Sequence, residues 1–110
     1  MQIDFDLLEN KKIINFKNGL GELCLKKFED HSVKIMQSVL AEGSSIGEHF
    51  HTDDCEIIYV LSGEGIATCN GETEQLKKGV VHYCSKNSWH KIINSAKSDL
   101  VMYAIVIKHL

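Results

Sequence analysis

The sequence predicts an all-β fold, and three features of it support this prediction. Short runs rich in β-branched and aromatic residues recur along the whole chain, and turn-forming residues separate them at regular intervals. Strands at such spacing are typical of a β-sandwich or a β-barrel. No segment has the apolar repeat of a long helix, and Leu7–Lys12 accommodates at most one helical turn. At 110 residues the chain is long enough for one hydrophobic core and too short for two.

Turn signals set the boundaries of the expected strands. They fall at Asn18-Gly19, Glu42-Gly43-Ser44-Ser45, Ser62-Gly63-Glu64-Gly65, Asn70-Gly71, Lys78-Gly79 and Lys86-Asn87-Ser88. In chain order the expected strands are Ile13–Phe16, Glu22–Phe28, Val33–Leu40, Glu48–His51, Glu56–Leu61, Gly65–Cys69, Glu72–Leu76, Val81–Cys84, His90–Asn94 and Leu100–Ile107. The Asn70-Gly71 pair predicts a two-residue hairpin, because Asn and Gly both tolerate positive φ.

Two of these strands, Glu56–Leu61 and Leu100–Ile107, are apolar on both faces. A strand in a small sandwich needs only one buried face, so a second apolar face implies a further covering layer. Either the N-terminal segment or a partner subunit can supply that layer. Because symmetric dimers are the commonest oligomers, we expect a homodimer.

Three histidines and one glutamate form a candidate metal-binding set, namely His49, His51, Glu56 and His90. His49 and His51 are two residues apart on an expected strand, so both side chains point to one face. Glu56 follows His51 by an odd number of residues and would face away on an unbroken strand. The turn-like Thr52–Cys55 segment predicts a reversal that returns Glu56 toward the imidazoles. Mixed imidazole and carboxylate ligands suit one divalent transition metal ion: Mn, Fe, Co, Ni or Zn.

The spacing of these residues resembles the two motifs of the cupin superfamily. The first motif is Gly43, five residues, His49-Phe50-His51, four residues, Glu56, six residues and Gly63. The second is Gly79, five residues, Ser85-Lys86-Asn87, two residues, His90, three residues and Asn94. Ser85 stands where the family usually has proline, and Asn87 stands where it usually has glycine. Asn tolerates a left-handed backbone, so we expect the turn at Asn87 to survive.

This resemblance implies a double-stranded β-helix, the cupin jelly-roll barrel, as a single domain over residues 1–110. Residues from about 1 to 30 are then N-terminal strands or an arm packed on the barrel, and residues from about 31 to 110 are the barrel core. Similar sites in the superfamily support dioxygenation, oxalate decarboxylation and isomerisation. The resemblance therefore implies a metal-dependent enzyme acting on a small polar metabolite at open metal positions. The alternative is a non-catalytic cupin that binds or senses a ligand.

Residues that share a face with the metal-binding set are expected to shape the pocket. Ile58 and Val60 share parity with Glu56, and Ile92 shares parity with His90. Gln37 has the parity of Val33, Ile35 and Val39, so it is a candidate polar pocket residue that orients substrate. Tyr103 is a second candidate for that role, and His82 is a further pocket candidate. No ligand spacing surrounds His31, His82 or His109, which is typical of ordinary hydrogen-bonded histidines.

Charge and composition exclude several partners. The net charge of −3 and the absence of a dense lysine cluster argue against nucleic acid. The chain has no arginine, so a site for a dicarboxylate or a sugar nucleotide would have to rely on lysine, backbone or metal, which is a mild argument against those substrates and does not exclude them. No export signal or membrane-length apolar run is present, which predicts a cytoplasmic protein with no membrane partner. The four cysteines are accordingly expected to be free thiols.

Overall fold

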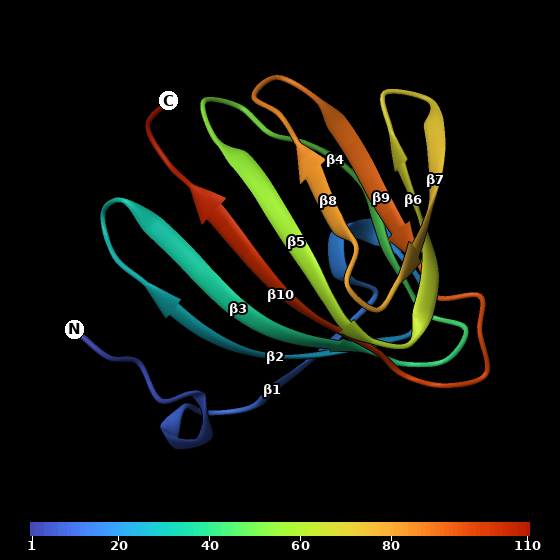
Figure 1. Ribbon diagram of the computed structural model, residues 1–110, viewed down its shortest axis with the longest axis horizontal. Coiled ribbons are helices and arrows are strands. Elements are labelled where there is room, and N and C mark those ends of the chain that lie inside the picture. The colour runs from blue at the N-terminus through green and yellow to red at the C-terminus, as the bar shows by residue number, and fades with distance from the viewer.

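Two antiparallel sheets enclose the core in the computed structural model, which describes residues 1–110 (Figure 1). The strands are β1 (Lys11–Ile14), β2 (Glu22–Glu29), β3 (Val33–Leu40), β4 (Ser45–Phe50), β5 (Cys55–Ser62), β6 (Glu64–Cys69), β7 (Glu72–Lys77), β8 (Val81–Cys84), β9 (Trp89–Ile93) and β10 (Leu100–Ile107). Six strands form one sheet in the order β1-β2-β3-β10-β5-β8, and four form the other in the order β4-β9-β6-β7. The all-β prediction is confirmed, and each expected strand is present with its ends displaced by a few residues.

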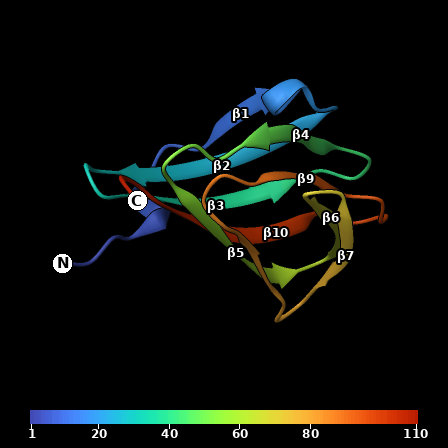
Figure 2. The ribbon, with the colours of Figure 1, turned by 90° about the horizontal axis from the view of Figure 1, so that it is seen from above.

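Two short 3₁₀ turns, η1 (Phe5–Leu7) and η2 (Phe16–Asn18), are the remaining regular elements. The η2 turn follows β1 and lies beside β4 (Figure 2). Asn15 ends β1 earlier than expected because it adopts a left-handed conformation, with φ of 54°. No helix has the length and apolar character needed to cross a membrane.

The hydrophobic core lies between the two sheets and draws on both. Its fully buried members include Leu40, Val60, Ile92, Leu100 and Met102. The predicted inward orientation of Ile58, Val60 and Ile92 is confirmed, because each is at most 2% exposed. Alternation from these positions carries Glu56 and His90 into the same interior.

Two turns have the backbone conformation that their residues predict. Asn70 and Gly71 have φ of 49° and 82°, so the β6–β7 hairpin has the two positive φ values of a type I′ turn. Asn87 has φ of 61°, which explains how it replaces the usual glycine of the second motif. All four cysteines are free thiols, as expected.

The outer face of the six-stranded sheet is apolar and only partly covered. The η1 turn places Phe5 edge-on against Tyr103, with ring centroids 5.4 Å apart. Tyr59, Val81 and Tyr83 remain 44%, 56% and 58% exposed. The N-terminal segment therefore covers part of the doubly apolar strands and leaves the β5–β8 edge open.

Asn94 joins two segments at one end of the barrel. Its side chain is fully buried and donates to the carbonyls of Leu40 and Ser98, at 2.9 and 2.8 Å. Its carbonyl oxygen accepts from the Ala96 backbone amide at 3.0 Å. One amide group thus connects the end of β3 to the loop between β9 and β10.

We predict that Asn94→Ala lowers the free energy of unfolding by about 2–4 kcal/mol, since one buried and two partly buried backbone groups lose their partner. Urea denaturation measures this change. Lys97→Ala, in the same loop but exposed, is the control and should stay within about 0.5 kcal/mol of the unmodified protein. Equal stability of the two variants would contradict the assigned role of Asn94.

Candidate metal centre

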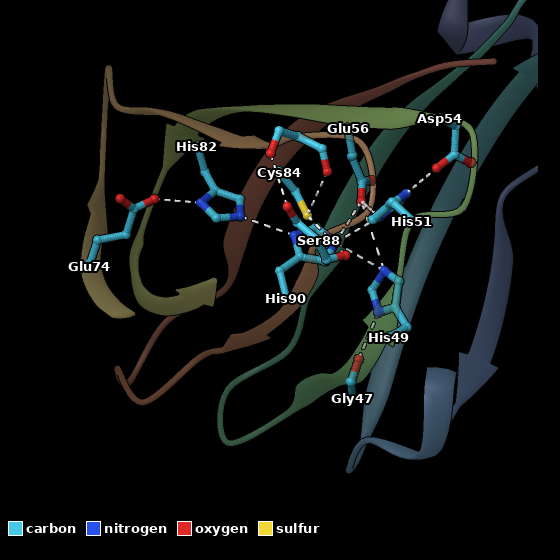
Figure 3. A network of polar contacts seen from close by, with 11 residues as sticks. Gly47, His49, His51, Asp54, Glu56, Glu74, His82, Cys84, Ser88 and His90 are labelled. Carbon is cyan, nitrogen blue, oxygen red and sulfur yellow. Dashed lines mark hydrogen bonds and ion pairs between the residues drawn. The ribbon is translucent and has the colours of Figure 1, made fainter. Parts of the chain in front are cut away.

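Four side chains converge inside the barrel, from the β4 strand and its end, from β5 and from β9 (Figure 3). They are His49, His51, Glu56 and His90, and their candidate ligand atoms all lie within 4.8 Å of one another. The Nε2 atom of His90 is 3.0 Å from Nε2 of His51, 3.0 Å from Nε2 of His49 and 3.0 Å from Oε1 of Glu56. The structure therefore brings together all four residues that the sequence singled out.

A β-bulge in β4 turns His49 inward. The β4–β9 register pairs Ile46 with Ile92 and His49 with His90, and it shifts between these two pairs. Ile46 and His49 are three residues apart, yet the bulge lets both face the interior. Gly47 permits the accompanying close approach, because a Cβ there would lie 2.0 Å from the carbonyl oxygen of Lys17. The backbone of the η2 turn thus packs directly on the bulge.

The turn after His51 reverses the chain as predicted. Asp53 takes a left-handed conformation with φ of 56°, and β5 begins at Cys55. The reversal places Oε1 of Glu56 3.1 Å from Nε2 of His51. Asp54 of this turn also contacts the site, since its carboxylate lies 2.7 Å from Nδ1 of His51.

Each imidazole of the set has a partner for its outer nitrogen. Nδ1 of His49 lies 2.8 Å from the Gly47 carbonyl oxygen, and Nδ1 of His51 faces the Asp54 carboxylate. Carbonyl and carboxylate oxygens only accept, so both rings carry hydrogen on Nδ1. Their Nε2 atoms are then bare or become protonated only as cationic imidazolium. Bare nitrogens and a carboxylate at about 3 Å repel one another unless a cation lies among them, which suits a metal ion.

Comparison with known proteins identifies the family. Residues 36–106 match the sequence profile of the cupin domain. The chain is a cupin. An oxalate-binding protein of Thermotoga maritima is 32% identical over 103 residues, which cover 88% of this cupin and 85% of that protein.

Solved structures agree with this assignment. A predicted oxalate decarboxylase from Thermotoga maritima has a TM-score of 0.92 and 28% identity, over 98% of this chain and 99% of that one. The cupin domain of Schizosaccharomyces pombe Cnp3 has a TM-score of 0.75 and 15% identity, over 92% of this chain and 87% of that one, which shows the fold alone. The double-stranded β-helix implied by the two motifs is confirmed.

Electrostatics in the cupin's interior favour an ionised carboxylate. Burial raises the pKa of Glu56, but the hydrogen bonds and charges of His51 and His90 outweigh it and hold the pKa at about 2. The hydrogen bond to Glu56 raises the pKa of His51 against the effect of burial, and Asp54 adds to the rise. Burial is the main cause that lowers the pKa of His49. A cation bound at Nε2 of His51 would take the place of the proton that this raised pKa favours.

A small cavity of about 30 Å³ opens into the barrel beside His49, Glu56 and His90. Beyond His49, Glu56 and His90, its only polar lining residue is Ser38. The remaining lining is apolar: Phe16, Leu23, Leu25, Met36, Ile46, Ile58, Ile92, Met102 and Ala104. An apolar wall strengthens charge interactions at the one polar end of the cavity.

Two lysines that were not among the expected pocket residues lie at the mouth of the cavity. Lys17 of the η2 turn and Lys34 of β3 line it together with His49, His51, Asp54 and Glu56. Lys17 reaches the mouth because the η2 turn packs on β4, and residue spacing does not show that contact.

Gln37 and Tyr103 were expected in the pocket, but the structure places both on the outer face of the sheet. They are paired across β3 and β10, and the Gln37 amide donates to the Tyr103 hydroxyl at 3.2 Å on the outer face of the sheet. The inward residues of β3 are Met36, Ser38 and Leu40. Both faces of β3 are apolar, so parity with Ile35 and Val39 was an unreliable guide. Ser38 occupies the position that the sequence analysis gave to Gln37.

His82 is more closely tied to the site than its sequence context indicates. It is 1% exposed, and its Nε2 lies 3.0 Å from Nδ1 of His90. By contrast, His31 and His109 stack on each other at 4.3 Å, away from the four converging residues. The contact of His82 crosses from β8 to β9, so residue spacing gave no signal for it.

We predict that the cupin purified without chelators or a histidine tag holds about one divalent transition metal ion per chain, and that His51→Ala weakens metal affinity at least about tenfold. Elemental analysis after dialysis measures both. His31→Ala removes an imidazole outside the set and should keep full metal content. Full stoichiometry in His51→Ala would contradict the proposed centre.

Proposed function

We propose that this cupin binds a divalent transition metal ion through His49, His51, Glu56 and His90 and holds a small dicarboxylate such as oxalate on that ion. The observation that carries the proposal is the convergence of four ligand atoms within 4.8 Å beside a small cavity. Four protein ligands leave one or two positions open on a five- or six-coordinate ion. When bound, a divalent ion would supply a Lewis acid for carboxylate oxygens at these positions.

The two lysines at the mouth support an anionic ligand. Lys17 and Lys34 flank the opening above the imidazoles, and the chain has no arginine to provide a bidentate clamp. A dicarboxylate can place one end on the ion and direct its remaining charge toward these ammonium groups. The small cavity favours a ligand of a few heavy atoms over a sugar or nucleotide.

The names of similar proteins agree with this ligand class. The 32% identical relative is called an oxalate-binding protein, and the 28% identical structure is called a predicted oxalate decarboxylase. The first name describes binding and the second describes turnover, so both functions have a basis among relatives.

Binding is favoured over turnover by what lines the cavity. Apart from the proposed ligands, only Ser38 offers a polar side chain inside, and a serine hydroxyl is a poor general acid or base without an activating partner. At the mouth, the Asp54 carboxylate already accepts from His51. A decarboxylase would have to rely on the ion and the two lysines alone, so it is the second candidate.

We predict that oxalate binds the metal-loaded protein, binds the metal-free protein at least about tenfold more weakly, and loses about tenfold in affinity, or about 1.4 kcal/mol, in Lys34→Gln. Isothermal titration with oxalate, malonate and acetate measures ligand size and charge preference. Lys97→Gln, far along the chain on an exposed loop, is the control. Equal oxalate affinity with and without metal would contradict the proposal.

The same samples separate binding from catalysis. Incubation with ¹³C-labelled oxalate, followed by NMR detection of formate and carbon dioxide, should show no turnover by the metal-loaded protein. Catalytic release of formate that is lost in Glu56→Ala would replace the binding function with the decarboxylase.

We also propose that a second copy of the chain covers the exposed part of the outer sheet face. Ile57 pairs with Tyr83, and Tyr59 pairs with Val81, so the four form an apolar patch on neighbouring strands β5 and β8. A two-fold dimer would bury this patch against itself.

Sedimentation velocity at micromolar concentration should therefore show a dimer for the unmodified protein and a monomer for Tyr83→Glu, because the substitution buries an unpaired charge in the interface. Leu20→Glu changes another exposed apolar residue, 68% exposed and outside this patch, and should leave the dimer intact. A monomeric unmodified protein would contradict the proposed interface.

A further inference from the structure

His82 and Glu74 form a chain of polar contacts that ends on the candidate metal centre. His82 lies on β8, and its Nδ1 is hydrogen-bonded to the Glu74 carboxylate of β7. Its Nε2 lies 3.0 Å from Nδ1 of His90 on β9. Figure 3 shows Glu74, His82 and His90 in a row, on the opposite side of the site from Asp54.

These polar contacts allow only one arrangement of the ring hydrogens when His82 and His90 are neutral. The Glu74 carboxylate only accepts, so the hydrogen of His82 lies on Nδ1. Nε2 of His82 is then a bare acceptor, and it takes a hydrogen bond from Nδ1 of His90. The hydrogen of His90 is thereby fixed on Nδ1, and its Nε2 faces Glu56, His49 and His51 as a bare nitrogen.

His90 needs this help more than the other two imidazoles do. His49 and His51 find their acceptors within three residues along the chain, at Gly47 and Asp54. The partner of His90 is another imidazole, which can either donate or accept through Nε2. Without Glu74, nothing in the structure dictates which of these His82 does.

We propose that Glu74 and His82 are positioning residues that fix His90 in the form whose Nε2 binds the metal ion. This inference rests on the proposed metal centre. His82 is 1% exposed and its ring lies nearly parallel to that of His90, at an interplanar angle of 13°. Glu74 is accessible from outside, with 52% of its side chain exposed. An ordinary packing role for His82 would require neither the Glu74 contact nor a fixed hydrogen.

Direct evidence comes from the imidazole ¹H–¹⁵N NMR spectrum of the Zn²⁺-loaded protein. We expect both His82 and His90 to carry hydrogen on Nδ1. In Glu74→Ala we expect the His82 signal to move toward the Nε2–H form and Co²⁺ affinity to fall about tenfold. Glu72→Ala is the matched control, since Glu72 lies two residues away on β7 and makes no contact with His82.

Two variants at position 82 separate positioning from packing. His82→Phe keeps an aromatic ring but removes the acceptor, and it should weaken Co²⁺ binding by about 10–100-fold and alter the visible Co²⁺ spectrum. His82→Gln restores an acceptor oxygen and should recover most of the affinity. A packing role predicts the opposite order, with phenylalanine better tolerated. Thermal unfolding of each metal-free variant tests whether the fold is retained. If His82→Phe fails to fold, the substitution at the half-exposed Glu74 still tests the proposal.

The outcomes separate the two proposals. A wild-type protein that binds no Zn²⁺ overturns the metal centre and this inference with it. Wild-type binding combined with unchanged affinity in Glu74→Ala and His82→Phe, or with hydrogen on Nε2 of His82, overturns the positioning role alone.

Discussion

The site depends on one constraint: three imidazoles must present bare Nε2 atoms at a single point beside a carboxylate. Each ring therefore needs an acceptor behind it, and three different parts of the barrel supply one. The β4 bulge provides the Gly47 carbonyl, the turn into β5 provides Asp54, and β8 provides His82. The bulge, the turn and the placement of β8 next to β5 are local solutions to the same requirement.

The rest of the interior is consistent with chemistry confined to that point. Apolar side chains from both sheets line the cavity, and Ser38 is its only additional polar group. In such surroundings a charged ligand would need a cation at the centre, or the lysines at the mouth, Lys17 and Lys34, to offset its charge. The barrel thus combines a strongly polar end with walls that offer little to assist bond breaking.

Much of this could be predicted from the sequence where the signal was local. Turn residues such as Asn70-Gly71 marked the strand ends, and spacing brought His49 and His51 to one face. Parity failed on β3 because both of its faces are apolar: one packs in the core and the other carries Gln37 under the N-terminal segment. The link from Glu74 through His82 to His90 joins three consecutive strands, of which β8 belongs to the other sheet. Residue spacing does not show which side chains meet between the two sheets.

The segment around η2 lies outside the part of the chain that matches the cupin family. The cupin profile covers residues 36–106, which include all four converging side chains. Lys17 and Lys34 precede that range, although both lie at the mouth. Two proteins can therefore match the profile equally well, keep the same centre and still admit different molecules to it. Inheritance of the barrel carries the four converging side chains with it, while Lys17 and Lys34 can change without altering them.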